Sequence, residues 1–279
     1  MPLKQFTLSQ LLNPLNERTL IQGILNITPD SFSDGGTFQR VDVAVAHAIQ
    51  MVSDGADWID IGGESTRPGA AAVSLDEELS RVIPVIEAVR KEVDVPISID
   101  TYKAEVARQA LEVGANIIND VWSLQRDPDM VNVAIAAGCP VIFNHNRINP
   151  MPVGKNVEDV VIADLIAYTQ DAISKGLDPR QIITDPGIGF GHKSTQDNLR
   201  LMNYLNELVK LGYPVLLGTS RKKFIRETLN RPALEVLEGT ASTIVSGIFQ
   251  GCTIVRVHDV LEIKRTVMMC DAIRKARGK

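Results

Sequence analysis

Leu20–Ile27 (LIQGILNI) and Trp58–Ile61 (WIDI) are two nearly continuous apolar runs, and the residues between them follow a different period. From Val41 to Val52 an apolar residue returns every three or four positions, which is the spacing of one helix face, and Gly55 then ends the pattern. Parallel strands that are covered on both faces are apolar throughout, as these two runs are. The stretch therefore predicts a strand, a helix and a second parallel strand.

The rest of the chain repeats this unit. Helical patterns run from Val157 to Ala172 and from Leu199 to Leu208, and Asp259 is placed to cap a last helix that ends near Ala276. Eight strand–helix pairs predict a (β/α)₈ TIM barrel over residues 1–279 as a single domain, since such barrels have about 250 residues. An open, doubly wound sheet is the alternative. The further apolar runs are Pro96–Asp100, Asn116–Asn119, Pro140–Phe143, Gln181–Asp185, Pro214–Leu217 and Cys252–Val257.

Composition and charge exclude several classes of protein. Hydrophobic residues make up 44% of the 279 residues and the net charge is −5, which argues against a nucleic-acid or membrane-surface binder. The longest stretch without charges, Gly239–Val255, is too polar to span a membrane. The start of the chain shows no signal peptide, and the three cysteines lack metal-type spacing, so we expect a reduced, cytoplasmic protein.

Polar residues stand at or just after the end of every predicted strand. In a barrel these positions meet at one mouth, where barrel enzymes carry their chemistry. A single polar strand end is usually a turn former or a helix cap, but eight of them point to a site. The set comprises Asn26, Asp60, Asp100, Asn119, His145, Asp185, Ser220, Arg221, Lys222, Arg256 and His258.

The chemistry of this set suits a flat, donor-rich heterocycle with an anionic tail. A carboxylate such as that of Asp185 can accept two parallel N–H bonds from a ring N–H and a neighbouring amine. Lys222, Arg256, His258 and Arg67 are cations that suit phosphate or carboxylate groups. Three structural alternatives stay open: Lys222 as a surface lysine, His258 as a helix cap, and Asp60 and Asp100 as interior carboxylates paired with a cation.

Several motifs of other enzymes are missing from the sequence. GIGFG at Gly187–Gly191 lacks the third glycine of a dinucleotide fingerprint, and no phosphate-binding Walker sequence or HExxH motif occurs. Ser220 has no evident activating base. No activated nucleophile therefore stands out in the sequence.

Several specific segments follow one another along the chain: GILNITPDSFSDGG (Gly23–Gly36), DIGGESTRPGA (Asp60–Ala70), DPGIGFG (Asp185–Gly191) and GTSRK (Gly218–Lys222). With these segments the chain resembles, over nearly its whole length, the dihydropteroate synthases, the sulfonamide-targeted folate enzymes. The resemblance implies a TIM barrel that joins 6-hydroxymethyl-7,8-dihydropterin diphosphate to p-aminobenzoate by dissociative loss of diphosphate. It also implies a Mg²⁺ cofactor and a homodimer.

By this resemblance, each substrate has its own set of residues, and Lys222, Arg256 and Asp100 are the catalytic candidates. The pterin is assigned to Asp100, Asn119, Asp185, Lys222 and Arg256. The diphosphate is assigned to Asn26, Arg67, Arg256 and His258, with Asn26 and Asp34 as the Mg²⁺ ligands. The p-aminobenzoate is assigned to Phe32, Thr66, Arg67, Pro68, Phe190 and Lys222.

The sequence departs from the family pattern at two positions. Lys223 stands where the family usually has Ser, and Asn144 stands where it commonly has Met. These changes leave two alternatives: a pterin-binding paralogue without synthase activity, or a pterin-dependent methyltransferase. The complete TPDSFSDGG and STRPGA segments favour the synthase.

Overall fold

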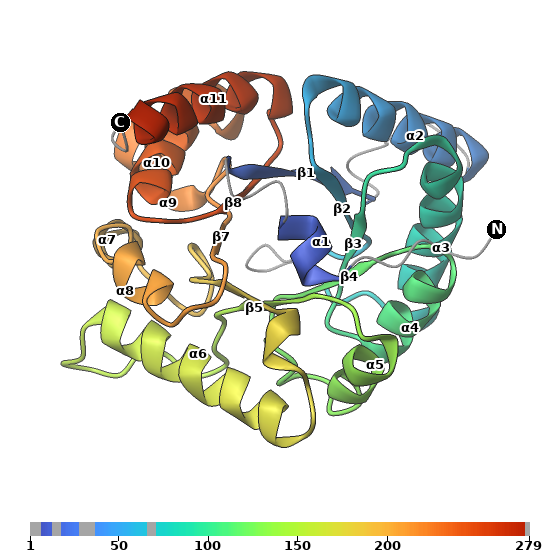
Figure 1. Cartoon of the computed structure of the whole chain (residues 1–279), viewed down its shortest axis with the longest axis horizontal. Helices are drawn as coiled ribbons and strands as arrows, with labels where there is room; N and C mark the ends of the chain where they lie inside the picture. Colours follow the sequence, from blue (N-terminus) through green and yellow to red (C-terminus); the bar gives the residue numbers. More distant parts are fainter. Residues whose placement is uncertain (1–6, 13–17, 28–36, 66–70, 277–279) are drawn as a thin grey trace.

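Eight parallel strands form a closed barrel in the computed structural model, which describes residues 7–12, 18–27, 37–65 and 71–276. They pair in the order β6-β5-β4-β3-β2-β1-β8-β7, and a bridge between Thr184 and Val215 joins β6 to β7. The predicted TIM barrel is therefore confirmed, and the open sheet is wrong (Figure 1). The strands are β1 (Leu20–Asn26), β2 (Trp58–Gly62), β3 (Ile97–Asp100), β4 (Ile117–Asp120), β5 (Val141–Asn144), β6 (Ile182–Asp185), β7 (Leu216–Leu217) and β8 (Ile254–Val257).

Helices follow the strands in alternation and surround the barrel (Figure 1). None of those in the described residues is long and apolar enough to cross a membrane. The α-helices are α1 (Leu8–Leu12), α2 (Thr37–Asp54), α3 (Leu75–Glu92), α4 (Ala104–Glu112), α5 (Met130–Ala137), α6 (Val157–Ser174), α7 (Thr195–Leu201), α8 (Leu205–Val209), α9 (Lys223–Leu229), α10 (Leu237–Phe249) and α11 (Val260–Ala276). Two 3₁₀ turns are η3 (Pro179–Gln181) and η4 (Ala233–Glu235).

The helix predicted over Leu199–Leu208 is two helices in the structure, α7 and α8. The side chain of Gln250 lies at the break: its amide nitrogen donates to the carbonyl of Met202 at 2.7 Å, and its oxygen accepts the N–H of Leu205 at 3.0 Å. These bonds satisfy backbone groups that a continuous helix would have paired internally.

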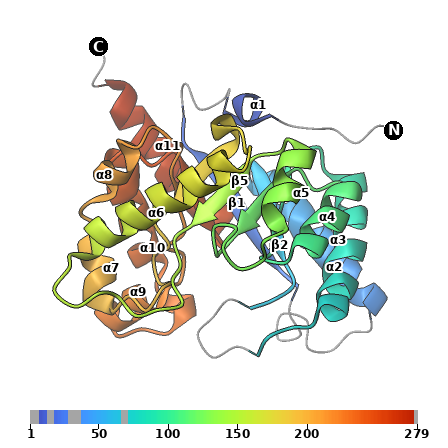
Figure 2. The same ribbon diagram turned by 90° about the horizontal axis from the view of Figure 1, so that it is seen from below.

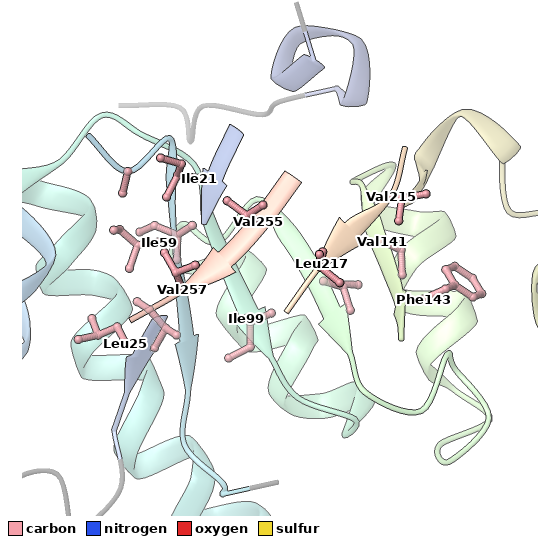
Figure 3. Packing of buried hydrophobic residues seen from close by; sticks show 14 of the residues in the cluster. Ile21, Leu25, Ile59, Ile99, Val141, Phe143, Val215, Leu217, Val255 and Val257 are labelled. Carbon is pink, nitrogen blue, oxygen red and sulfur yellow. The ribbon is translucent and has the colours of Figure 1, made fainter. Parts of the chain in front are cut away.

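Outward-facing strand residues pack against the helices and form the larger core. Ile21, Ile59, Val141, Phe143 and Val255 are all fully buried there (Figure 3). Because both faces of each strand are covered, the strands have the unbroken apolar character seen in the sequence.

A second apolar cluster fills the barrel interior at the amino ends of the strands. Trp58 is its largest member, and Leu8 and Leu11 of α1 belong to the same cluster, so α1 covers this end of the barrel (Figure 2). The strand residues of this cluster are Leu20, Trp58, Ile117, Ile142, Ile183, Leu216 and Ile254.

Strand register places a polar layer above that apolar cluster. Asp60 lies beside Ser98, Asp100 beside Asn119, and Asn144 beside Asp185. Strand side chains alternate between the two faces. These residues therefore share the interior face with the residues two positions earlier in their strands, such as Trp58 below Asp60 and Ile183 below Asp185. The carboxyl end of the barrel is therefore polar inside.

Candidate active site

Asp60 is the centre of the polar layer. Its buried carboxylate accepts bonds from Ser98 Oγ at 2.5 Å, from Asn119 Nδ2 at 3.1 Å and from Arg256 Nε at 2.6 Å. Gln22 extends the network by donating to Ser98 Oγ at 2.9 Å. Asp60 was predicted as a polar strand end, whereas Gln22 and Ser98 were not predicted as site residues. Their inward positions in β1 and β3 are the signal that could have identified them.

Arg256 connects Asp60 to Asp100. Its Nη2 lies 2.6 Å from Asp100 Oδ2, so both carboxylates are ion-paired, which is the structural alternative left open for them. Burial lowers the pKa of Arg256, but Asp60 and Asp100 raise it by more, so the guanidinium stays charged. Burial raises the pKa of Asp100 to about 7 even though Arg256 acts to lower it. The pairs fix the plane of the guanidinium at the barrel mouth.

Asp185 lies at the end of β6 with one oxygen already bonded. Oδ1 accepts the N–H of Gly187 at 2.7 Å. A Cβ at Gly218 would lie 3.7 Å from Asp185 Oδ2 and 3.8 Å from Arg256 Cβ, so the backbone of Gly218 lies close to both side chains. Burial raises the pKa of Asp185 to about 6.

Lys222, in the segment after β7, lies near the charges of Asp185, Arg256 and Asp100. Its ammonium lies 3.7 Å from the centre of the Phe190 ring, within cation–π distance. Burial lowers the pKa of Lys222 to about 8, and the charges of Asp185 and Asp100 oppose that shift. Lys222 is therefore not a freely solvated surface lysine, and that structural alternative is wrong. Lys223, by contrast, is exposed and lies 3.4 Å from Glu227.

His258 and Ser220 join the ends of β7 and β8. Ser220 Oγ lies 3.0 Å from His258 Nδ1 and accepts the backbone N–H of His258 at 3.2 Å. The expectation that Ser220 has no base nearby is therefore wrong. Asp259 directly precedes α11, at the position predicted for its cap, and its carbonyl accepts the N–H of Ile263 at 3.1 Å. Its side chain accepts Arg221 Nε at 3.1 Å.

Asn144 and Asn26 are two further amides at strand ends, in addition to Asn119. Asn144 is buried, and its Oδ1 has no hydrogen-bond partner in the described structure. Asn26 ends β1 beside Gly62 and is half-buried.

Five predicted site residues cannot be placed. Phe32, Asp34, Thr66, Arg67 and Pro68 lie outside the described residues. Within the ranges that the structure does describe, no three His, Cys, Asp or Glu side chains are grouped as a metal site.

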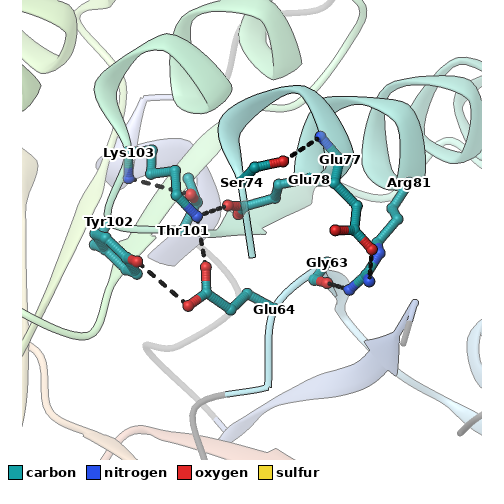
Figure 4. Close-up of polar contacts among 9 residues, drawn as sticks. All are labelled: Gly63, Glu64, Ser74, Glu77, Glu78, Arg81, Thr101, Tyr102 and Lys103. Carbon is teal, nitrogen blue, oxygen red and sulfur yellow. Dashed lines mark hydrogen bonds and ion pairs between the residues drawn. The ribbon is translucent and has the colours of Figure 1, made fainter. Parts of the chain in front are cut away.

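An ion-pair cluster that sequence reasoning missed lies below the segment after β2. Lys103 contacts both Glu64, at 2.5 Å, and Glu78 of α3, while Arg81 donates to the carbonyl of Gly63 at 2.6 Å (Figure 4). Tyr102 donates to Glu64 at 3.3 Å. These contacts anchor residues 63–64 to α3 and to the start of α4.

Known proteins share both the fold and the sequence. Residues 22–258 match a family model described as pterin binding enzyme. The dihydropteroate synthase of Bacillus subtilis is 52% identical over 265 residues, which cover 94% of this chain and 91% of that protein.

Two solved structures extend the likeness to three dimensions. The dihydropteroate synthase of Clostridium difficile, crystallised with pteroic acid, has a TM-score of 0.89 at 48% identity and covers 92% of this chain and 97% of its own. That of Xanthomonas albilineans with 7,8-dihydropteroate has a TM-score of 0.85 at 39% identity, over 92% and 94% of the two chains.

Barrel, polar mouth and family match together define an enzyme that binds a pterin. Within that class, the chain belongs to the dihydropteroate synthase family.

Proposed function

We propose that the polar layer holds the pterin while cations at the mouth receive the leaving diphosphate. The reaction is that of a dihydropteroate synthase: 6-hydroxymethyl-7,8-dihydropterin diphosphate and p-aminobenzoate give 7,8-dihydropteroate and pyrophosphate. The observation that carries the proposal is that Asp185 lies beside the Asp60–Arg256–Asp100 ion pairs at the carboxyl end of the barrel.

Pterin recognition rests on buried acceptors. Because Asp185 Oδ1 is bonded to Gly187, the carboxylate has a fixed orientation and presents Oδ2 to the ring. A pterin has a ring N–H beside an exocyclic amine, and a carboxylate pairs with both. Asn119 and Asp100 line the same layer, and Arg256 covers it.

Departure of the diphosphate needs stabilisation of negative charge. Arg256, with its charge held by two carboxylates, and His258 lie at this end, and Arg67 joins them in the proposal. Breaking the C–O bond before the amine attacks needs no protein nucleophile, and fixed positive groups then lower the barrier. The Ser220 hydroxyl serves here to hold His258.

We propose Mg²⁺ as the cofactor, with Asn26 and Asp34 as ligands. An amide oxygen at the end of β1 fits, because Mg²⁺ prefers oxygen ligands and often takes few from the protein and the rest from phosphate and water. The bound ion supplies positive charge to the diphosphate. If Asn26 is a ligand, Asn26→Ala should remove the Mg²⁺-dependent part of pyrophosphate binding in calorimetry, whereas unchanged Mg²⁺ dependence would contradict the assignment.

The p-aminobenzoate site is proposed to include Lys222 and Phe190 with Phe32, Thr66, Arg67 and Pro68. The Lys222–Phe190 contact offers a cation and an aromatic face to a small aromatic acid. A sulfonamide has similar chemistry and should compete for this site. Lys223 is exposed and directly follows Lys222 in the chain. Lys223→Ser should therefore leave the enzyme active and change only the KM for p-aminobenzoate.

Pyrophosphate release that requires both substrates is the decisive assay. Lys222→Ala should lower turnover strongly and keep the melting temperature, because the side chain lies on a loop at the mouth. A wild-type protein that binds pterin without releasing pyrophosphate would instead be a binding paralogue.

We further propose a cytoplasmic homodimer. Cys139 and Cys252 are buried as free thiols whose pKa burial raises to about 12, so they suit a reducing compartment. On α11 the side chains of Leu261, Met268, Met269 and Ile273 are exposed on one helix face, and a second copy of this chain is the partner we propose for it.

A further inference from the structure

Lys193 is a cation that the proposed reaction does not use. Its Nζ lies 2.9 Å from the carbonyl of Gly187, 2.8 Å from the carbonyl of Phe190 and 2.9 Å from His145 Nδ1. Three donors of one ammonium therefore meet three acceptors. Burial lowers the pKa of this lysine to about 7. Burying an ammonium costs free energy, which the three hydrogen bonds offset.

His145 is held so that it can accept this bond. It is fully buried, and its Nε2 lies 3.0 Å from Asp164 Oδ2, which also accepts Arg147 Nη1 at 2.6 Å. Burial lowers the pKa of His145 to about 4, so the ring is neutral at neutral pH. With Nε2–H donated to Asp164, Nδ1 is the ring's acceptor, and Lys193 is connected through the ring to α6.

The two carbonyls belong to the turn that carries Phe190. Phe190 N–H donates to the Gly187 carbonyl at 3.0 Å, so Lys193 binds both ends of one turn. The turn needs left-handed glycines at 187 and 189, and a Cβ on Gly189 would come within 2.9 Å of Lys222 Cδ. A small displacement of the turn would therefore change how Phe190 meets Lys222.

We infer that Lys193 is a positioning residue for the p-aminobenzoate site, acting by tying the Gly187–Phe190 turn to His145. This inference rests on the proposed function. Asp185 should be less affected than Phe190. Its Oδ1 accepts the Gly187 N–H, but its backbone is held by β6 pairing and by the N–H of His145, whereas Phe190 lies three residues further along the turn.

Kinetics of Lys193→Met test the inference. The variant keeps side-chain length but loses all three bonds, and we expect the KM for p-aminobenzoate to rise about tenfold while that for the pterin diphosphate changes by less than about threefold. Lys210→Met, at an exposed lysine whose ammonium pairs with Glu207, is the matched control and should leave both KM values unchanged.

A double-mutant cycle separates positioning from a merely structural role. If Lys193 acts through Phe190, Lys193→Met added to Phe190→Leu should raise the KM for p-aminobenzoate little further. Additive effects, or equal rises in both KM values, would overturn the inference. If Lys193→Met does not fold, Lys193→Arg keeps the charge but cannot direct three donors to the same acceptors, and an unchanged KM for p-aminobenzoate would overturn it too.

Assays of the wild-type protein distinguish a failure of the proposed function from a failure of the Lys193 inference. Absence of pyrophosphate release by the unaltered protein contradicts that function. The role of Lys193 is then read from equilibrium binding of p-aminobenzoate, which Lys193→Met should weaken about tenfold against Lys210→Met.

Discussion

Asp185 tests pterin recognition at a single atom. In Asp185→Asn the amide oxygen stays on the Gly187 N–H, so the new NH₂ group faces the pterin donors. Leaving these buried donors unpaired should cost about 3 kcal/mol, a loss of about a hundredfold in affinity. Calorimetry with the pterin measures it, with the melting temperature as the control for folding. Equal affinity in variant and wild type would remove Asp185 from the site.

Asn144 carries a buried amide oxygen without a partner in the described structure. Asn144→Met, the residue that resembling proteins commonly have, should raise the free energy of unfolding by about 1 kcal/mol because the unpaired oxygen is removed. Asn116→Met is the matched control: Asn116 has the same 6% exposure, but its Oδ1 accepts the N–H of Ile97 at 3.1 Å. The control should lose stability. A destabilised Asn144→Met in urea titrations would show that the amide is satisfied.

The identity of the polar residues at the mouth could be predicted from the sequence, but their pairing could not. Asp60, Asp100 and Arg256 stand at the ends of strands that are far apart in the chain, and only barrel closure brings β8 beside β1. Lys193 lies two residues after the DPGIGFG segment (Asp185–Gly191), and its partner His145 is 48 positions away in the sequence. Their contact could therefore not be predicted from the sequence.

At the scale of the element, α1 covers the apolar end of the barrel. Leu11 is 6% exposed and belongs to the cluster around Trp58. Leu11→Ala should lower the free energy of unfolding by about 2–3 kcal/mol through lost burial and a residual cavity. Both KM values should stay unchanged, because the polar layer is at the opposite end. A change in either KM beside normal stability would contradict this division.

Elements with strong periodicity were predictable, and those that depend on distant partners were not. The Val157–Ala172 pattern became α6, and Gly176 follows it with φ of 108°. The break between α7 and α8 depends on Gln250, at the end of α10. The strand predicted over Pro214–Leu217 shortens to two residues because Pro214 has no N–H for the ladder.

At the scale of the whole molecule, the exposed apolar face of α11 should form the dimer contact. Introducing charge there with Met268→Glu and Met269→Glu should give a monomer in sedimentation equilibrium, because a buried carboxylate pair at an interface is unfavourable. Leu234→Glu, at a residue 80% exposed in η4, is the control and should leave the dimer intact. A wild-type monomer would contradict the proposal.

Buried carboxyls also contribute to the pH dependence of folding. Burial raises the pKa of Asp100 and Asp120 to about 7 and of Asp185 to about 6. A raised pKa means that the folded state holds the proton more tightly, so this contribution to stability is full below about pH 4 and is lost as pH rises through 6–7. Asp120→Asn should reduce the fall in unfolding free energy between pH 5 and 8 relative to wild type. An identical slope in urea titrations would show that Asp120 is ionised at lower pH.

The barrel also has one joint that is weaker than the rest. Between β6 and β7, Thr184 N–H donates to the carbonyl of Pro214 at 2.9 Å, and the proline has no N–H to return a bond. Asp185 directly follows this joint on one strand, and Lys222 follows the other. A pterin that contacts both residues would connect β6 to β7 where backbone pairing is sparse. Its binding should therefore slow amide hydrogen exchange along both strands.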